Sequence, residues 1–359
     1  MPMDMAAFAL ALPKMELHLH LEGAVLPATF ADLAKKNGIP LPPHDDIMEF
    51  YQYSDLPEFL KVYDLVCQSM RDADDFRRTT YEMLASCADG GGRYVEFFFS
   101  PHAHQAFGVE YATMLDGILA GMREAETDHG VRSRLIPAHS RELGPERGEA
   151  FLDMVLANRP DEVIGIGLDY NEAPYPPAPF EAVWRRAREN GLHVTAHAGE
   201  SGPAANVRDS LDILKVERID HGYRIVDDPE LMARCLAEGT HFTCCPSTSL
   251  VTSVWKDLSA PDHAIRRMID AGLNVSIHSD DPPMFETNLG NEYVRVATEM
   301  KLTPDQLKAC CLDAVTASWL DASEKRDLLS AWSAEIDTLI AGLAPAAGTP
   351  ATLSPEMRH

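Results

Sequence analysis

Basic residues are scarce in this chain of 359 amino acids: 31 Lys and Arg stand against 56 Asp and Glu, giving a formal net charge of -25 at pH 7. A surface this acidic repels phosphate backbones and anionic lipids, so nucleic acids and membranes are poor partners. Acidity also favours solubility, so the charge does not identify a substrate.

The chain has only 7 Cys, with no Cys-x-x-Cys spacing. Adjacent cysteines, such as Cys244–Cys245 and Cys310–Cys311, rarely bridge each other because disulfide geometry disfavours it. This usage is typical of a reducing compartment. The apolar run 6–12 is short and follows Asp4 rather than a basic segment, so it reads as an N-terminal arm and not a signal peptide. No run reaches the length of a membrane span. We therefore expect a soluble, cytoplasmic protein.

Short β-prone runs alternate with helical patterns along most of the chain. The expected strands are 15–23, 93–101, 134–140, 163–172, 193–200, 218–224, 241–247 and 274–282. The expected helices between them are 111–128, 147–157, 180–190, 207–214, 228–238 and 262–271. Alternating strands and helices indicate a parallel sheet, and eight such units predict a single (β/α)8 TIM barrel of the α/β class. We expect it to span residues 1–343 as one domain.

Two segments depart from this rhythm. About seventy residues separate the first two strands, far more than a simple connection needs. In this insert, 24–90, a helical pattern places Leu56, Phe59, Leu60 and Tyr63 on one face, where they form either core or a hydrophobic lid over the barrel mouth. Two further helices, 304–320 and 323–343, follow the last strand, and the tail 344–359 has the composition of a disordered segment.

Candidate metal ligands and acids lie at the ends of four expected strands. His18 and His20 are two apart on the first strand, so both imidazoles point to the same side. Similar residues end the fifth, sixth and eighth strands: His197 and Glu200, Asp220 and His221, and His278, Asp280 and Asp281. The carboxyl ends of barrel strands form the catalytic face, and this residue set suits a metal-dependent hydrolase.

Four motifs, which are His18 to Gly23, His197 to Glu200, His221-Gly222 and Ser279 to Pro282, resemble those of the adenosine deaminase family, which includes adenine deaminases. The resemblance extends from about Pro13 to Leu320. It implies a barrel with one Zn²⁺ per chain, ligated by His18, His20, His197 and Asp280, and it implies catalytic roles for Glu200, His221 and Asp281.

The chemistry of such a reaction agrees with these residues. Attack at C6 of a purine is helped when N1 is protonated, and Glu200 is placed three residues beyond His197 to supply that proton. His221 and Asp281 are expected to orient the attacking hydroxide and to stabilise or accept its proton. Zinc makes hydroxide available at neutral pH.

Three other classes compete with this interpretation. A binuclear amidohydrolase commonly needs a carboxylated lysine at the end of strand four, and the segment 165–172 contains none. The cytidine deaminase class needs a Pro-Cys-x-x-Cys ligand pair, which is absent. A non-catalytic purine-binding homologue would be expected to have lost a ligand or the acid, whereas every matching residue is present.

The expected partner is a small purine nucleoside or base, and the sequence carries no signal of an oligomeric state. Glu22, Gly167 and Tyr170 are the expected substrate-binding residues. Glu22 and the segment Gly-Leu-Asp-Tyr-Asn-Glu resemble adenine deaminases, whereas 100–102 and 212–215 resemble adenosine deaminases. We therefore expect adenosine as substrate, with adenine or a modified 6-aminopurine as alternatives. His278 is expected in the core, and the roles of His102, His104 and His139 are left open.

Overall fold

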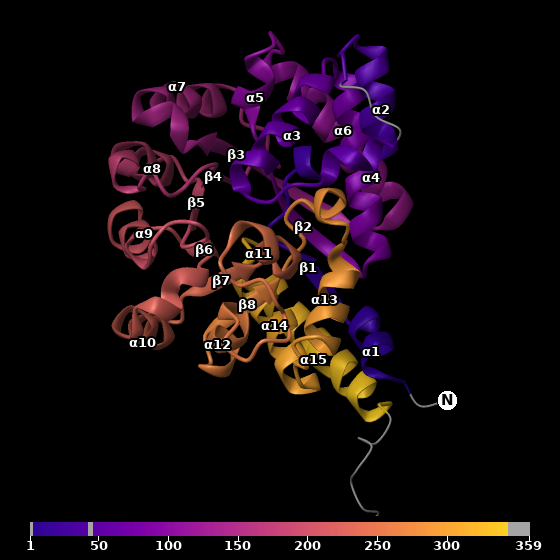
Figure 1. The fold of residues 1–359 in the computed structure, drawn as a ribbon, viewed down its shortest axis with the longest axis vertical. Helices are drawn as coiled ribbons and strands as arrows, with labels where there is room; N and C mark the ends of the chain where they lie inside the picture. Colours follow the sequence, from indigo (N-terminus) through magenta and orange to yellow (C-terminus); the bar gives the residue numbers. More distant parts are fainter. Residues whose placement is uncertain (1–2, 42–45, 344–359) are drawn as a thin grey trace, which may run out of the picture.

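The chain folds into eight parallel strands surrounded by helices, as a computed structural model that describes residues 3–41 and 46–343 (Figure 1). The strands are β1 (Lys14–Glu16), β2 (Gly92–Phe99), β3 (Arg132–Ser140), β4 (Gly165–Asp169), β5 (His193–Ala198), β6 (Arg218–His221), β7 (His241–Cys244) and β8 (Asn274–Ile277). The main helices are α1 (Met5–Ala11), α2 (Pro27–Lys36), α3 (Leu56–Ser69), α4 (Ala73–Asp89), α5 (Pro101–Gln105), α6 (Tyr111–His129), α7 (Gly144–Ala157), α8 (Glu181–Glu189), α9 (Ala204–Asp209), α10 (Pro229–Glu238), α11 (Pro246–Thr252), α12 (Ala264–Asp270), α13 (Leu289–Thr298), α14 (Pro304–Ala317) and α15 (Ala322–Ala341). Short turns complete the set: η1 (Glu22–Ala24), η2 (Ile47–Tyr51), η3 (Arg141–Leu143), η4 (Ala178–Phe180), η5 (Ser210–Leu214), η6 (Tyr223–Asp227) and η7 (Pro282–Phe285).

The strands follow one another around the sheet in sequence order, each parallel to the next. The sheet closes where the segment after β1 meets the segment after β8. There the amide of His20 donates to the carbonyl of Asp280 at 2.9 Å, and the amide of Asp280 donates to the carbonyl of His18 at 3.0 Å. The expected (β/α)8 barrel is confirmed, and its seam runs through candidate metal ligands.

The first strand is shorter than expected. Regular pairing ends at Glu16, although the sequence predicts a strand over 15–23. The reason is visible at Leu17, whose backbone amide donates to the imidazole Nδ1 of His278 at 3.0 Å instead of to a neighbouring strand. Pairing resumes as isolated bridges at Leu19 and His20.

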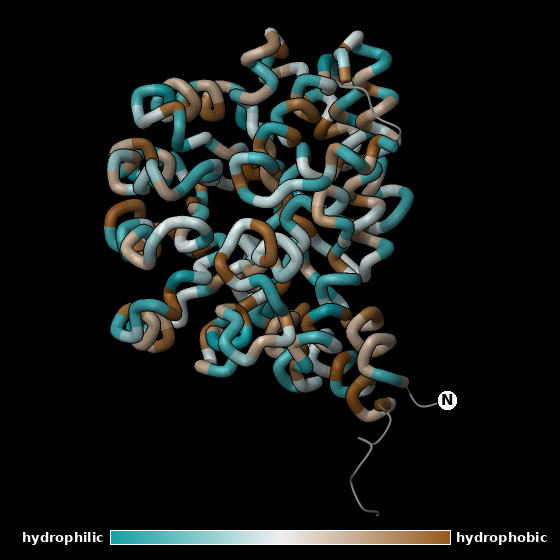
Figure 2. The backbone as a smooth tube through the Cα atoms, viewed as in Figure 1, coloured by the Kyte–Doolittle hydropathy of each residue, from teal (hydrophilic) through white to brown (hydrophobic). Residues whose placement is uncertain are grey.

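Helices of the insert after β1 cover part of the catalytic end of the barrel. In Figure 1, α3 and α11 lie in front of the strands, while α4 and α6 pack together at the right. Phe59 and Tyr63 of α3 are almost fully buried, because one face of this amphipathic helix packs towards the barrel mouth. Hydrophobic and hydrophilic stretches alternate along the surrounding helices, as expected for a ring that is solvated on one side (Figure 2).

Both described ends of the chain lie on the same side of the barrel. The N-terminal helix α1 buries Phe8 and contacts α13 and α15 (Figure 1). The segment 344–359, expected to be disordered, lies outside the described residues. Within 3–41 and 46–343 no helix combines the length and the apolar character needed to cross a membrane.

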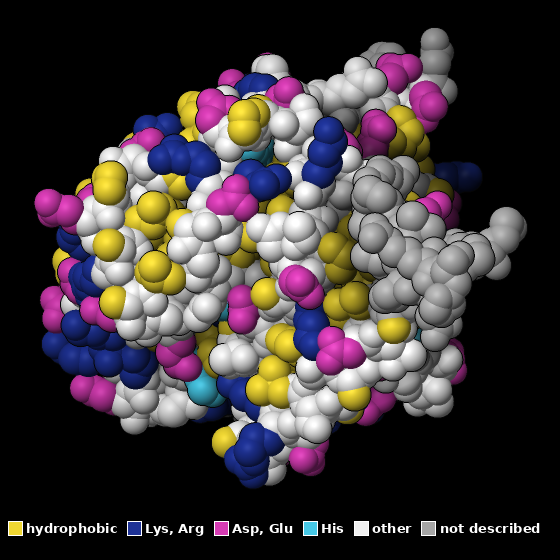
Figure 3. Space-filling model, turned by 90° about the horizontal axis from the view of Figure 1, so that it is seen from below, with side chains coloured by type: hydrophobic (Ala, Val, Ile, Leu, Met, Phe, Trp, Pro, Cys, Tyr) yellow, Lys and Arg dark blue, Asp and Glu magenta, His cyan; other side chains and the backbone are white. Residues whose placement is uncertain are grey.

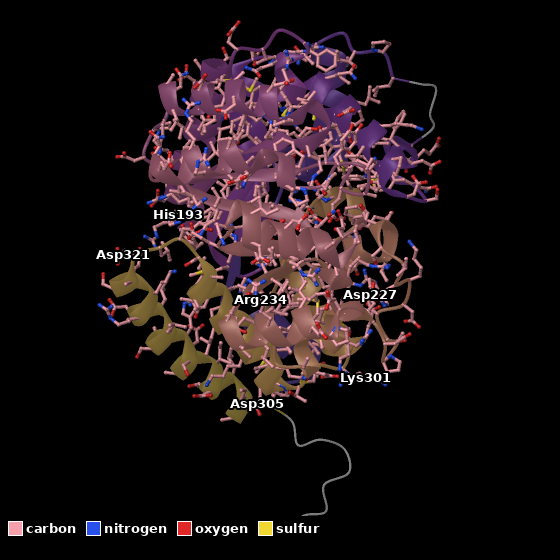
Figure 4. All side chains as sticks on the ribbon, turned by 90° about the vertical axis from the view of Figure 1, so that its left-hand side faces the viewer. His193, Asp227, Arg234, Lys301, Asp305 and Asp321 are labelled. Carbon is pink, nitrogen blue, oxygen red and sulfur yellow. The ribbon has the colours of Figure 1, made fainter. Side chains whose placement is uncertain are left out.

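Charged side chains of both signs are interspersed on the face shown in Figure 3. Figure 4 shows charged residues of the outer ring, such as Asp227 and Arg234, at the surface of the molecule. Arg234 forms an ion pair with Asp212 at 2.7 Å, and exposed pairs of this kind contribute at most about 1 kcal/mol each.

Candidate active site

Four residues from four strand ends converge in the barrel mouth. A possible ligand atom from each of His18, His197, His221 and Asp280 lies within 4.8 Å of the others, and all four side chains are buried. His20 contacts the same group, since its Nε2 lies 3.1 Å from Nε2 of His197 and 3.4 Å from Oδ1 of Asp280. The structure thus brings together all four expected ligands, with His221 beside them.

Hydrogen bonds at the outer nitrogen fix how His18 presents its ring. Its Nδ1 lies 2.8 Å from Oγ1 of Thr243, and that hydroxyl donates its only proton to Asp220 at 3.1 Å. Nδ1 must therefore donate to Thr243, so in the neutral imidazole the lone pair lies on Nε2. This Nε2 has no hydrogen-bond partner and faces Asp280 at 3.2 Å.

His221 is oriented in the same way by Tyr223. The Tyr223 hydroxyl donates to the carbonyl of Cys245 at 3.1 Å and accepts from the amide of Cys245 at 3.0 Å. Its remaining contact, 3.0 Å to Nδ1 of His221, must be accepted from the imidazole. The lone pair on Nε2 of His221 therefore points towards Glu200 at 3.7 Å and Asp280 at 3.9 Å.

These donor atoms fit a metal ion. Burial lowers the pKa of His20 to about 4 and that of His197 well below its usual value, so both imidazoles are neutral, the form that ligates metals. The close approach of two Nε2 atoms, from His20 and His197, needs a cation or a shared proton between them. Three imidazoles with one carboxylate form a ligand set typical of catalytic metal sites, and His18 has the outer hydrogen bond usual for such ligands.

Glu200 lies in the loop after β5 and lines the catalytic cavity. Burial raises the pKa of its carboxyl, so the protonated form persists to higher pH than for an exposed glutamate. The loop is held by Glu172, whose carboxylate accepts hydrogen bonds from the amides of Gly199, Glu200, Ser201 and Gly202 and from the side chain of Asn206. Glu172 is therefore a positioning residue for Glu200.

Asp281 and Asp169 line the catalytic cavity, and each has one carboxyl oxygen without a hydrogen-bond partner. Oδ1 of both residues is buried and has no hydrogen-bond partner. Both line the catalytic cavity, whose volume is about 40 Å³. Burial raises the pKa of Asp169 to about 7. Asp281 packs directly against Gly23, where a Cβ would lie 1.6 Å from its Oδ1, so only glycine fits beside it.

The three expected substrate-binding residues differ in position. Tyr170 lines the cavity. Glu22 is fully buried and its oxygens accept from the amide of Ser100, the imidazole of His104 and the hydroxyl of Tyr63. Gly167 lies deeper in β4, where a Cβ would approach the Phe98 ring at 2.9 Å. The structure therefore brings Tyr170 to the cavity directly and Glu22 through Tyr63, and it leaves Gly167 below.

The structure also places the histidines whose roles the sequence left open. His104 binds Glu22 through Nε2 and the carbonyl of Cys67 through Nδ1, whereas His102 and His139 line a second, outer cavity. His278 has contacts at both nitrogens, to Ser276 and to Glu16, and is a buried core residue as expected.

Three residues at the strand ends have an unusual backbone conformation. Tyr170, His221 and Asp280 have φ values of 67°, 68° and 61°, in the left-handed region that residues other than glycine rarely adopt. Such conformations cost roughly 1–3 kcal/mol each and cluster at functional sites.

Sequence reasoning missed Glu172, Asp169 and the partners Thr243 and Tyr223. Asp169 and Glu172 both lie at the end of the fourth strand, so their position alone marked them as candidates for the catalytic face. Thr243 and Tyr223 carry no comparable signal, because their roles arise from tertiary contacts.

A parallel (β/α)8 barrel with a buried imidazole and carboxylate cluster at the carboxyl ends of its strands is an arrangement typical of metal-dependent hydrolases. The family model described as adenosine deaminase matches residues 13–335. The chain belongs to the adenosine deaminase family and is a deaminase acting on 6-aminopurines.

Individual relatives are more specific. The chain is 38% identical to an adenine deaminase from Sphingopyxis alaskensis over 330 residues, covering 91% of this chain and 96% of the relative. It superposes on an amidohydrolase from Burkholderia ambifaria with bound zinc at a TM-score of 0.88 and 38% identity, covering 94% and 93% of the two chains. An adenine deaminase from Arthrobacter aurescens gives a TM-score of 0.86 at 34% identity, covering 91% and 99%.

Proposed function

We propose that this enzyme hydrolyses adenine to hypoxanthine and ammonia, with Zn²⁺ held by His18, His20, His197 and Asp280. The relatives named adenine deaminase support adenine, the alternative substrate in the sequence analysis, better than adenosine, the first expectation. The zinc-bound relative supports the choice of metal.

The donor atoms described above suit Zn²⁺, which binds imidazole nitrogens and carboxylate oxygens and would be held by these four residues. When bound, zinc lowers the pKa of a water molecule towards 7 and so supplies a nucleophile at neutral pH. The remaining steps fall to residues of the chain.

Glu200 and His221 carry out the proton transfers. The protonated Glu200 carboxyl donates to N1 of the purine, which makes C6 more electrophilic. In its neutral form His221 presents the lone pair of Nε2 towards the centre, because its Nδ1 proton is donated to Tyr223. That nitrogen is placed to accept the proton of the attacking water, and general acid and base contacts of this kind each contribute about 10²–10⁴-fold.

Asp281 lines the same cavity as Glu200, and one of its carboxyl oxygens has no hydrogen-bond partner. With C6 at the metal cluster and N1 at Glu200, the other nitrogen near C6 is N7. We place Asp281 at N7, which would fix the ring in the plane required for attack at C6. This orienting role differs in its target from the hydroxide contact expected from the sequence.

We assign to Asp169 the preference for a free base over a nucleoside. The far edge of adenine presents N3, an acceptor, beside N9–H, a donor. A protonated carboxyl offers the complementary pair, and Oδ1 of Asp169 is buried and unpartnered in a residue that lines the cavity. A nucleoside has no proton on N9, so it would leave a buried polar atom unpaired, which costs about 1–3 kcal/mol. A site built to bond an N–H rejects analogues without it strongly.

A substrate panel tests the proposal. Zinc-loaded enzyme is incubated with adenine, adenosine, AMP and N6-methyladenine at neutral pH, and release of ammonia, or of methylamine from N6-methyladenine, is measured. We expect adenine to have the highest kcat/KM and adenosine to be at least about 10³-fold worse. Turnover of adenosine equal to that of adenine would contradict the assignment of the free base while leaving the deaminase chemistry intact.

A further inference from the structure

A second, outer cavity adjoins the catalytic cavity and is much larger, with a volume of about 670 Å³ against about 40 Å³. Its walls come from α3, α5, α7 and the loops after β3 and β4. Among the residues that the structure describes, Tyr170 alone lines both cavities. Tyr170 therefore lies at the boundary between them.

Contacts on both sides hold the side chain of Tyr170 in place. The Tyr170 hydroxyl donates to Oδ1 of Asp64 on α3 at 3.2 Å. Its ring packs edge-on against Tyr63, with centroids 5.9 Å apart, and against His102, with centroids 5.0 Å apart. The backbone of Tyr170 is left-handed, with φ 67°.

The lining of the outer cavity indicates what it can accept. Phe107, Phe151 and Met154 supply apolar surface, and burial lowers the pKa of His102 to about 3 and that of His139 to about 4, so both rings are neutral. One guanidinium, Arg147, lines the cavity together with two carboxylates, Asp64 and Glu142. This mixture suits an uncharged group with hydroxyls, such as a pentose, and disfavours a phosphate.

We propose that Tyr170 determines substrate size, by separating the space for a purine base from an outer cavity that would otherwise hold the sugar of a 6-aminopurine nucleoside. This inference rests on the proposed orientation of the base. If the N3 and N9 edge faces Asp169, a substituent on N9 points at the next residue, which is Tyr170. Removing the phenol joins the two cavities along the path that this substituent must take.

The first test is Tyr170→Gly, with Tyr170→Phe as the matched control. Glycine adopts φ 67° without strain, so the backbone is retained. We expect Tyr170→Gly to raise kcat/KM for adenosine at least about tenfold, while AMP gains nothing. Tyr170→Phe keeps the ring and loses only the bond to Asp64, so adenosine should not gain. A folded, zinc-loaded Tyr170→Gly enzyme that deaminates adenine without any gain on adenosine would overturn the proposal.

A second variant shows where the sugar lies. Ala150 on α7 is exposed and lines the outer cavity, so Ala150→Trp fills that space without touching the catalytic residues. Alone it should leave adenine turnover unchanged, and combined with Tyr170→Gly it should abolish the gain on adenosine. A gain that survives in the double variant would show that the sugar binds elsewhere and would refute the inference. Wild-type enzyme that already deaminates adenosine well would overturn both proposals, whereas failure of the variants alone would overturn only this one.

Discussion

The carboxylate of Glu172 accepts a hydrogen bond of 3.0 Å from the backbone amide of Glu200. The same carboxylate holds three neighbouring amides and Asn206, so one side chain at the end of β4 fixes the loop after β5. The proposed acid is thus positioned by a residue that does not reach the substrate.

This relationship predicts the effect of Glu172→Gln. The new side-chain amide presents N–H groups to a ring of N–H donors, so the loop should shift and Glu200 with it. We expect kcat for adenine to fall about 10–100-fold, with zinc content retained, as for other residues that support a metal site indirectly. Steady-state kinetics and metal analysis measure both quantities. Glu189→Gln, at an exposed site on α8, is the control and should be neutral.

Glu200→Gln should abolish most turnover because a neutral amide cannot protonate N1. We expect a loss of about 10²–10⁴-fold in kcat with normal zinc content and thermal stability. Full activity in the metal-loaded variant would exclude the role of Glu200 in proton transfer.

The KM for adenine should depend on pH through the protonation of Asp169. Burial raises its pKa to about 7, above the value of an unfolded chain, so the protonated form that pairs with N3 and N9–H dominates below pH 7 and is lost as pH rises through 7. We expect KM for adenine to rise above that pH in the wild type. Asp169→Asn carries a donor and an acceptor at every pH, so its KM should stay flat between pH 6 and 8. Parallel profiles for the two enzymes would show that Asp169 does not titrate against the substrate.

Gly23→Ala should lower kcat/KM because the added methyl group displaces Asp281. A methyl group there would lie 1.6 Å from Oδ1 of Asp281, so this carboxyl must move. Displacements of about 1 Å can cost about 100-fold in rate, and we expect a loss of that size in kcat/KM. Gly342→Ala, where the added carbon has only ordinary contacts, is the control and should show wild-type kinetics.

Chelation of the metal should abolish activity and loosen the barrel where it closes. The amides of His20 and Asp280 form the backbone hydrogen bonds of the seam, and both residues are expected ligands. We expect faster hydrogen exchange at these two amides after chelation and recovery of both exchange protection and activity with Zn²⁺. Exchange that is insensitive to the metal would show that the seam does not depend on it.

The architecture was predictable because hydrophobic runs and the residues that end them recur eight times, and each run became a strand. The positions of His18, His20, His197 and Asp280 followed from their places at strand ends, since parallel strands deliver their carboxyl ends to one face.

Other features depend on contacts that no local pattern encodes. The early end of β1 requires the side chain of His278, which is remote in sequence. The inward orientation of Glu22 is set by Tyr63, Ser100 and His104, which come from other segments. Tyr170 has a left-handed backbone that a bulky residue disfavours, so sequence alone does not predict its direction.

Because the candidate ligands lie where the barrel closes, the site can form only after the last strand has been synthesised. His18 and His20 are translated long before Asp280. Because Asp280 forms the two hydrogen bonds that join the last strand to the first, the complete ligand set cannot exist in a nascent chain that stops before β8. A partly made barrel of this protein would therefore be unable to assemble its metal centre, and catalytic competence would arrive together with closure of the fold.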